Sequence, residues 1–192
     1  MTTQWADYEE VTGGLTDPVD PSRDHITGAA NAPVTLVEYG DYQCPFCVQA
    51  HPMVAALLQA DRPPIRYVFR HFPLTTVHPR AEPAAEAAEA ANAQGRFWPM
   101  HDLLFSNSPA LEDEDLLASA RALGLDERRF ARDLVERVHA PRVRADFLTG
   151  VRSGVNGTPT FFINGVRHNG AFEYPVLRAA IEATARTEAG RR

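Results

Sequence analysis

Two runs of β-branched and apolar residues predict buried strands near the start of the chain. Residues 34–39 read VTLVEY and are ended by Gly40 and Asp41. Residues 65–72 read IRYVFRHF and are stopped by Pro73. Short runs of this composition, bounded by Gly or Pro, are typical of strands.

Between these runs the apolar positions change to helical spacing. From Pro45 onward the residues that share one face are Cys47, Ala50, His51, Val54, Leu57 and Leu58. Pro45 suits the first helical position, where its missing N–H costs nothing. Pro52 lies inside the helix and is expected to kink it.

Residues 79–153 carry helical patterns only. Ala and Glu, both strong helix formers, dominate the first of them. The expected helices are 84–93, 99–105, 113–123, 127–138 and 141–151. The acidic run 112–115 suits a helix N-terminus, where negative charge interacts favourably with the helix dipole. At roughly 75 residues this block is long enough to be a subdomain.

Strand character returns near the C-terminus. Residues 160–163 read TFFI, and their two phenylalanines should face opposite sides of a sheet. Asn164-Gly165 is a strong hairpin signal, so a short strand around Val166 should pair back. A last helix is expected over residues 174–187. The order predicts an α/β core interrupted by an all-helical subdomain, with residues 1–25 as an arm or edge segment.

Composition and charge argue against several classes of function. The chain has 192 residues, 44% of them hydrophobic, and a net charge of −6, which suits an ordinary globular domain. All 19 basic residues are Arg, so lysine Schiff-base chemistry is excluded. The Arg residues are scattered among acids and form no basic stripe, so no nucleic-acid partner is expected.

The amino-terminal segment has no targeting pattern. Residues 1–14 hold three acids and no basic region followed by an apolar run, so no signal peptide is predicted. No stretch approaches the roughly 18 apolar residues of a membrane span. The expected location is therefore cytoplasmic. A chain from which a signal had been removed would look the same, and would be periplasmic or otherwise extracytoplasmic.

The only two cysteines, Cys44 and Cys47, lie three residues apart. A structural disulfide there would close almost no loop, and a secreted scaffold would carry more cysteines. The pair therefore points to redox chemistry or to metal binding. A structural zinc site usually needs four ligands. The chain has no second Cys pair, and its seven histidines are dispersed without ligand spacing. We predict a redox pair, with no metal and no cofactor.

The position of the pair explains how it could react. A thiolate is the nucleophile, and the free N–H groups and positive dipole end of a helix N-terminus stabilise it. Cys44, at the open end of the predicted helix, is expected to attack. Cys47, one turn further on the apolar face, is expected to be the buried resolving thiol.

Four segments together resemble the DsbA-like branch of the thioredoxin superfamily. They are residues 24–51, which contain CPFC, 71–74 (HFPL), 95–102 (GRFWPMHD) and 154–165 (GVNGTPTFFING). The resemblance runs in order over about residues 24–185. It implies a thioredoxin-like fold with an inserted all-helical subdomain. The domain division is then an arm at 1–25, a core at 26–78 and 154–189, and an insertion at 79–153.

The resemblance also implies roles for further residues. Thr158-Pro159 matches the cis-proline loop that faces the two cysteines and offers its backbone to a substrate peptide. With Pro45 and Phe46, this loop is the expected substrate-binding surface. Glu38 matches a buried acid on the central strand, with proton exchange with Cys47 as its implied role.

One position departs from the best-known periplasmic oxidants of this branch. They carry Pro-His between the cysteines, whereas this chain has Pro45-Phe46. A cationic His would stabilise the thiolate and make the disulfide more oxidising. Phe46 cannot do so, which leaves the strength of the oxidant open.

Other conspicuous residues have simpler interpretations. Aromatic clusters are usually buried, so Phe97, Trp98 and Met100 are expected in the core of the insertion. Three histidines are expected to be structural rather than catalytic: His71, His78 and His101.

The expected function is dithiol–disulfide exchange with protein or peptide substrates, supported by a partner that recycles the redox pair. An alternative is a redox sensor or adaptor that uses the same fold as a binding surface with negligible turnover. A glutathione-linked transferase or isomerase is a third possibility. Relatives of that kind usually lack the second cysteine, so the presence of Cys47 argues against it.

Overall fold

A five-stranded mixed sheet forms the centre of the computed structural model, which describes residues 13–60 and 63–191. The strands are β1 (His25–Gly28), β2 (Val34–Gly40), β3 (Ile65–His71), β4 (Thr160–Ile163) and β5 (Val166–Arg167). Their order across the sheet is β1-β3-β2-β4-β5. Strands β2 and β3 are parallel, and the other neighbours are antiparallel.

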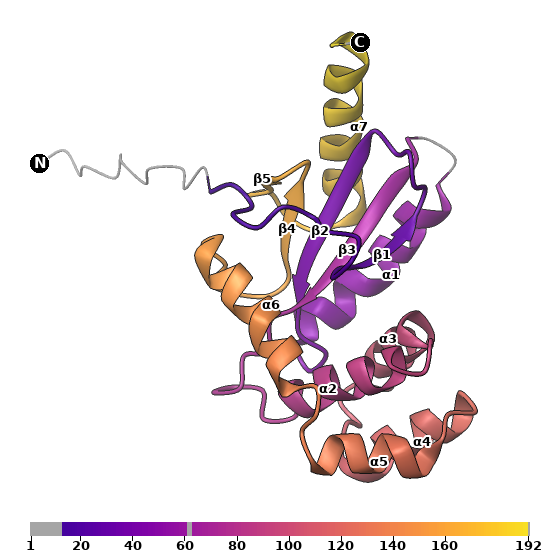
Figure 1. Ribbon diagram of the computed structural model, residues 1–192. Coiled ribbons are helices and arrows are strands. Elements are labelled where there is room, and N and C mark those ends of the chain that lie inside the picture. Colours follow the sequence, from indigo (N-terminus) through magenta and orange to yellow (C-terminus); the bar gives the residue numbers. More distant parts are fainter. Residues whose placement is uncertain (1–12, 61–62, 192) are drawn as a thin grey trace, which may run out of the picture.

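Helices cover both faces of this sheet (Figure 1). They are α1 (Pro45–Gln59), α2 (Ala81–Asn92), α3 (Phe97–Asn107), α4 (Asp113–Ala122), α5 (Glu127–Val135), α6 (Ala140–Arg152) and α7 (Tyr174–Gly190). Helices α1 and α7 pack on one face. Helix α6 packs on the other, together with the segment that precedes β1.

The alternation of side chains along β2 and β4 explains the two faces. Leu36 and Phe161 belong to the large core beneath α1 and α7, whereas Val37 and Phe162 belong to the smaller core beneath α6. Both faces are covered, so β2 is apolar almost throughout. The expectation that the two phenylalanines of β4 face opposite sides is confirmed.

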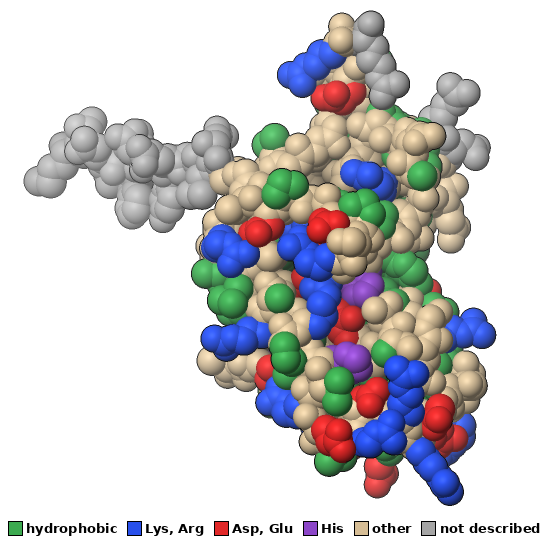
Figure 2. Space-filling model, in the orientation of Figure 1, with side chains coloured by type: hydrophobic (Ala, Val, Ile, Leu, Met, Phe, Trp, Pro, Cys, Tyr) green, Lys and Arg blue, Asp and Glu red, His purple; other side chains and the backbone are tan. Residues whose placement is uncertain are grey.

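Five helices, α2 to α6, lie between β3 and β4, and most of them extend beyond one end of the sheet (Figure 1). Helix α2 is the central one, since it contacts α3, α4, α5 and α6. Its alanines are almost fully buried, and their small side chains allow neighbouring helices to approach closely. Acidic and basic side chains are interspersed over the face shown in Figure 2.

A close approach between α6 and the sheet depends on Gly150. A Cβ atom at this position would lie 2.5 Å from Cδ2 of Phe72 and 3.0 Å from Cδ1 of Tyr39. Any larger residue would therefore push α6 away from the sheet.

The architecture confirms the predicted α/β fold with a thioredoxin-like core and a helical insertion. The helix over 113–123 ends one residue early, and its predicted acidic start is a capping box between Glu112 and Asp115. The helix over 127–138 ends at Val135, because Arg137 adopts a positive φ of 52°. Helix α1 continues across Pro52. The exact domain boundaries stay a prediction.

The segment before β1, which the sequence predicts to be an arm or edge segment, is attached to the sheet by backbone and side-chain hydrogen bonds. Residues 1–12 lie outside the described part of the chain. Gly14 forms a β-bridge with Val166, and the Arg70 side chain donates to the backbone oxygens of Asp17 and Pro18. Strand β1, which the pattern analysis did not predict, pairs with β3.

Among residues 13–60 and 63–191, no helix combines the length and the apolar character needed to cross a bilayer.

Candidate active site

Cys44 and Cys47 lie where β2 passes into α1. Cys44 is the N-cap residue of α1, with extended backbone angles of φ −71° and ψ 121°. Both cysteines are thiols in this structure. Cys44 is 3% exposed and Cys47 is 0% exposed, so only Cys44 has a path to a partner. Between them Phe46 is 56% exposed, and its ring meets that of Phe172 edge-on at 6.4 Å.

The loop before β4 faces Cys44. The Cys44 thiol donates a hydrogen bond to the backbone oxygen of Thr158 in this loop, with Sγ 3.2 Å from that oxygen. The peptide bond between Thr158 and Pro159 is cis. The hydroxyl oxygen of Thr158 is buried and has no hydrogen-bond partner among the described residues. This hydroxyl is therefore free to donate to the sulfur once Cys44 loses its proton.

The surroundings of Cys44 lower its pKa from 9.0 to about 5. The largest cause is a hydrogen bond from the Cys47 thiol, which outweighs the opposing effect of burial. Hydrogen bonds from Thr158 and from the backbone N–H groups of Phe46 and Cys47 lower this pKa further. Because Cys44 caps the helix, those N–H groups are ones that the helix itself leaves without partners.

The pKa of Cys47 moves in the opposite direction. Burial raises it well above the ordinary value, and the hydrogen bond to Cys44 and the nearby charge of Glu38 raise it further. The two thiols therefore differ in both access and acidity, as an attacking thiol and a buried resolving thiol would.

Glu38 lies on β2 beneath these cysteines and is 2% exposed. The hydroxyl of Tyr67, on β3, donates to its Oε2 at 2.6 Å. Burial raises the pKa of Glu38 from 4.5 to about 7, although the hydrogen bond from Tyr67 lowers it and the charge of Cys44 raises it. A Cβ atom on Gly40 would lie 3.1 Å from Oε1 of Glu38 and 2.4 Å from the ring of Phe69. Glycine at this position therefore leaves room for the carboxyl group.

Asp41 organises the turn that carries Cys44. Its Oδ1 accepts the backbone N–H groups of Gln43, at 2.8 Å, and Cys44, at 3.2 Å. Its Oδ2 accepts the N–H of Leu74 at 2.9 Å and lies 2.8 Å from Nδ1 of His78. One buried carboxylate thus joins the redox turn to the loop that follows β3.

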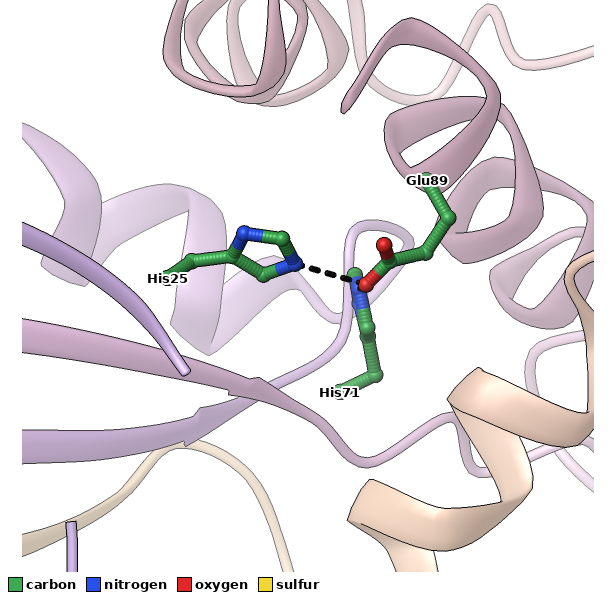
Figure 3. A group of neighbouring side chains, drawn as sticks. All are labelled: His25, His71 and Glu89. Carbon is green, nitrogen blue, oxygen red and sulfur yellow. Dashed lines mark hydrogen bonds and ion pairs between the residues drawn. The ribbon is translucent and has the colours of Figure 1, made fainter. Parts of the chain in front are cut away.

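A second polar group is buried between the sheet and the insertion (Figure 3). His25 on β1 and His71 on β3 point their Nε2 atoms at the same oxygen of Glu89 on α2, at 2.7 and 2.9 Å. The histidines are dispersed along the sequence, but the fold brings these two together on one carboxylate oxygen, so the expectation that they form no ligand grouping is wrong. Burial disfavours the charge of Glu89, but hydrogen bonds from both histidines hold its pKa well below its usual range.

The donor types of this group, two imidazoles and one carboxylate, are those of transition-metal sites. The shared oxygen, however, already accepts both imidazoles, and Nε of Arg142 lies 3.7 Å from it. Arg142 also pairs with the buried Asp146, so the two histidines, the two carboxylates and the guanidinium form one connected polar group. We therefore interpret the cluster as a hydrogen-bonded ion network. His51, His101 and Asp102 form another group, in which Nδ1 of His101 is bonded to Tyr42 at 3.0 Å.

The residues proposed from the sequence come together to different degrees. Cys44 and Thr158 are in direct contact, and Pro45 and Phe46 are exposed beside them. Glu38 and Cys47 are buried, and the charge of Glu38 raises the pKa of Cys47.

Three residues of the site have no sequence signal that links them to the cysteines: Asp41, Tyr67 and His78. The sequence places Tyr67 in a buried strand and Asp41 at the end of one, and it indicates only a structural role for His78.

The aromatic residues of the insertion lie partly at its border. Phe97 and Met100 are buried as expected. The ring of Phe97 stacks on His25 with centroids 3.4 Å apart, and Trp98 lies 5.7 Å from Tyr67. They therefore join the insertion to the sheet as well as filling its own core.

Comparisons with known proteins agree with this geometry. A family model described as Thioredoxin matches residues 21–183. BdbD from Bacillus subtilis has the same fold, with a TM-score of 0.76 and 23% identity over 92% of this chain and 98% of that one. A thioredoxin-like oxidoreductase from Silicibacter pomeroyi DSS-3 is 32% identical, with a TM-score of 0.74 over 87% of this chain and 94% of that one.

Curated relatives with similar sequences carry a different name. A Na⁺/H⁺ antiporter from Salinispora arenicola (strain CNS-205) is 52% identical over 89% of this chain, but the match covers 26% of that protein. An antiporter from Mycobacterium sp. (strain KMS) is 45% identical over 94% of this chain and 30% of its own length. This chain thus spans less than a third of those relatives, and their name describes proteins that extend far beyond the match.

Proposed function

The chain belongs to the thioredoxin family, and from this membership we propose that it is a member of the DsbA-like branch and exchanges disulfides with protein or peptide substrates through Cys44 and Cys47. The observation that carries the proposal is the contrast between the two thiols. The pKa of Cys44 is lowered to about 5 at a helix N-terminus, while the pKa of the fully buried Cys47 is raised.

In the oxidising direction, a substrate thiolate attacks Sγ of Cys44 in the Cys44–Cys47 disulfide, and Cys47 leaves as a thiolate that takes a proton from Glu38. A second substrate thiolate then attacks the substrate sulfur of the mixed disulfide and releases Cys44 as a thiolate. The substrate dithiol has then lost two electrons to the protein and two protons to the solvent. The protein is left with a Cys44 thiolate and a Cys47 thiol, and Glu38 regains its proton from the solvent. A redox partner then restores the disulfide.

Three features support the residue roles. A leaving group of low pKa is displaced faster, which suits Cys44 as the sulfur released from the substrate. Glu38, with a pKa of about 7, can exist in both protonation states near neutral pH and so can give or take the proton of Cys47. The backbone of Thr158 beside Cys44 and the exposed Phe46 offer an edge and an apolar surface for an extended peptide.

The antiporter relatives affect how far the proposal extends. Their ion transport belongs to proteins of which this chain matches less than a third. We attribute only the redox chemistry to this chain, since the Cys44–Cys47 pair and the thioredoxin family match both lie inside it.

Reduction of insulin by dithiothreitol tests the proposal. Catalysis should appear as earlier precipitation of the insulin B chain, and Cys44→Ser should abolish it. Oxidation of a dithiol peptide by the disulfide form should proceed in equal stoichiometry. A pair that can be titrated but gives no turnover in either assay would instead identify the redox sensor or adaptor.

A further inference from the structure

The Asp41 side chain accepts hydrogen bonds from the turn that carries Cys44 and from the loop that follows β3. This side chain is 1% exposed, yet it collects the N–H groups of Gln43 and Cys44 on one oxygen and those of Leu74 and His78 on the other. A carboxylate oxygen only accepts hydrogen bonds, so Nδ1 of His78 must carry the proton that lies between them.

This arrangement connects two segments that are far apart in the sequence. Gln43 and Cys44 belong to the turn before α1, whereas Leu74 and His78 belong to the loop between β3 and α2. Arg80 at the end of that loop donates its backbone N–H to Oε1 of Gln43 at 2.7 Å, which closes a second link between the same segments. The position of the Cys44 backbone is thus fixed from the loop that leads into the insertion.

The charge of Asp41 makes the link matter for redox chemistry. A carboxylate oxygen 3.2 Å from the backbone nitrogen of Cys44 disfavours a thiolate on the same residue, and hydrogen bonds donated to that carboxylate weaken this effect. His78 is in direct contact with Asp41, and its side chain retains 18% exposure.

We propose that Asp41 and His78 act as a pair of positioning residues, in which the Nδ1–H of His78 holds the Asp41 carboxylate and draws its charge away from Cys44, so that the turn presents Cys44 as a thiolate. Within the described residues, neither side chain forms a hydrogen bond with the sulfur of Cys44 or Cys47. The proposal rests on the proposed function for its biological meaning. The properties it concerns, the pKa of Cys44 and the reduction potential, can be measured even if the chain has no protein substrate.

Variants of His78 test the proposal, because this side chain is partly exposed and its replacement spares the buried carboxylate. His78→Ala removes the donor. His78→Asn returns an N–H donor close to the position of Nδ1, without the imidazole. His139→Ala, in the insertion, is the matched control for loss of a histidine.

Two readouts apply to each variant: the rate of alkylation of Cys44 at pH about 5, and the redox equilibrium with glutathione. In His78→Ala the alkylation rate should fall about twofold to fivefold, because less of Cys44 is thiolate. The redox equilibrium should shift about threefold to tenfold toward the disulfide form, which is about 15–30 mV more negative at about 30 mV per tenfold change. His78→Asn should recover most of both values, and His139→Ala should leave them unchanged.

Two results would overturn the proposal. One is a His78→Ala variant whose thermal midpoint falls while its alkylation rate and redox equilibrium stay at the wild-type values, which is what a purely structural contact would give. The other is an equal shift in His78→Ala and His78→Asn, which would separate the effect from the hydrogen bond to Asp41. Failure of the wild type in the insulin assay would contradict the proposed function but would leave these two readouts intact.

Discussion

Replacing Glu38 by Gln should stabilise the reduced protein at neutral and alkaline pH but not at acidic pH. The folded pKa of Glu38 is about 7, above its ordinary value of 4.5. Between these values the unfolded chain releases the proton that the folded chain keeps, so the wild type loses stability as pH rises from about 4.5 to about 7. At about 1.4 kcal/mol per pKa unit, burial of the ionised carboxylate costs about 3 kcal/mol above pH 7. The neutral amide of Glu38→Gln would avoid this cost, while its oxygen still accepted the hydroxyl of Tyr67.

Urea unfolding of the reduced proteins, kept reduced with a phosphine at pH 4 and pH 8, measures the effect. Glu38→Gln should match the wild type at pH 4 and exceed its free energy of unfolding by about 3 kcal/mol at pH 8. Glu136→Gln, at an exposed position of the insertion, controls for the loss of a negative charge. The reasoning would be refuted if the difference between Glu38→Gln and the wild type were the same at both pH values, or if the variant were the less stable at pH 8.

Three further predictions concern neighbouring groups. Thr158→Val keeps the side-chain shape but removes the hydroxyl, so the pKa of Cys44 should rise by about one unit in a thiolate titration; an unchanged pKa would show that the hydroxyl does not donate to the sulfur. Phe46→His places an imidazole beside Cys44 and should make the glutathione redox potential less negative; an equal or more negative potential would contradict this electrostatic argument. Glu89→Gln removes the buried charge that accepts hydrogen bonds from His25 and His71 and should lower the free energy of unfolding by about 3–5 kcal/mol. A loss below about 1 kcal/mol would show that the cluster in Figure 3 contributes little to stability.

Local patterns were sufficient to predict most of the fold. The strands β2, β3 and β4 and the order of the helices follow from apolar periodicity, and the hairpin between β4 and β5 follows from Asn164-Gly165. Strand β1 was missed because it has four residues, only one of them apolar, and it is a strand only through its pairing with β3. Its partner lies about 40 residues away, beyond the reach of any local pattern.

The residues of the candidate site also fall into those that the sequence predicts and those that it does not. Cys44 and Cys47 are recognisable from their spacing and from the helix that follows them, and Glu38 and Thr158 from their resemblance to the DsbA-like branch. Tyr67 and His78 reach the site from β3 and from the loop after it. His25, His71 and Glu89 meet only when the insertion packs against the sheet. Such groupings depend on tertiary contacts, and sequence spacing carries no sign of them.

The central claim, exchange through Cys44 with Cys47 as the resolving thiol, is tested most directly by trapping the mixed disulfide. Each single Cys→Ser variant would be incubated with a disulfide-containing peptide. The mass of the intact protein would then be measured by mass spectrometry under non-reducing conditions. We predict that Cys47→Ser accumulates a covalent adduct at Cys44, whereas Cys44→Ser accumulates almost none, because Cys47 is fully buried and its pKa is raised. Equal adducts in both variants, or an adduct in Cys44→Ser alone, would contradict the account.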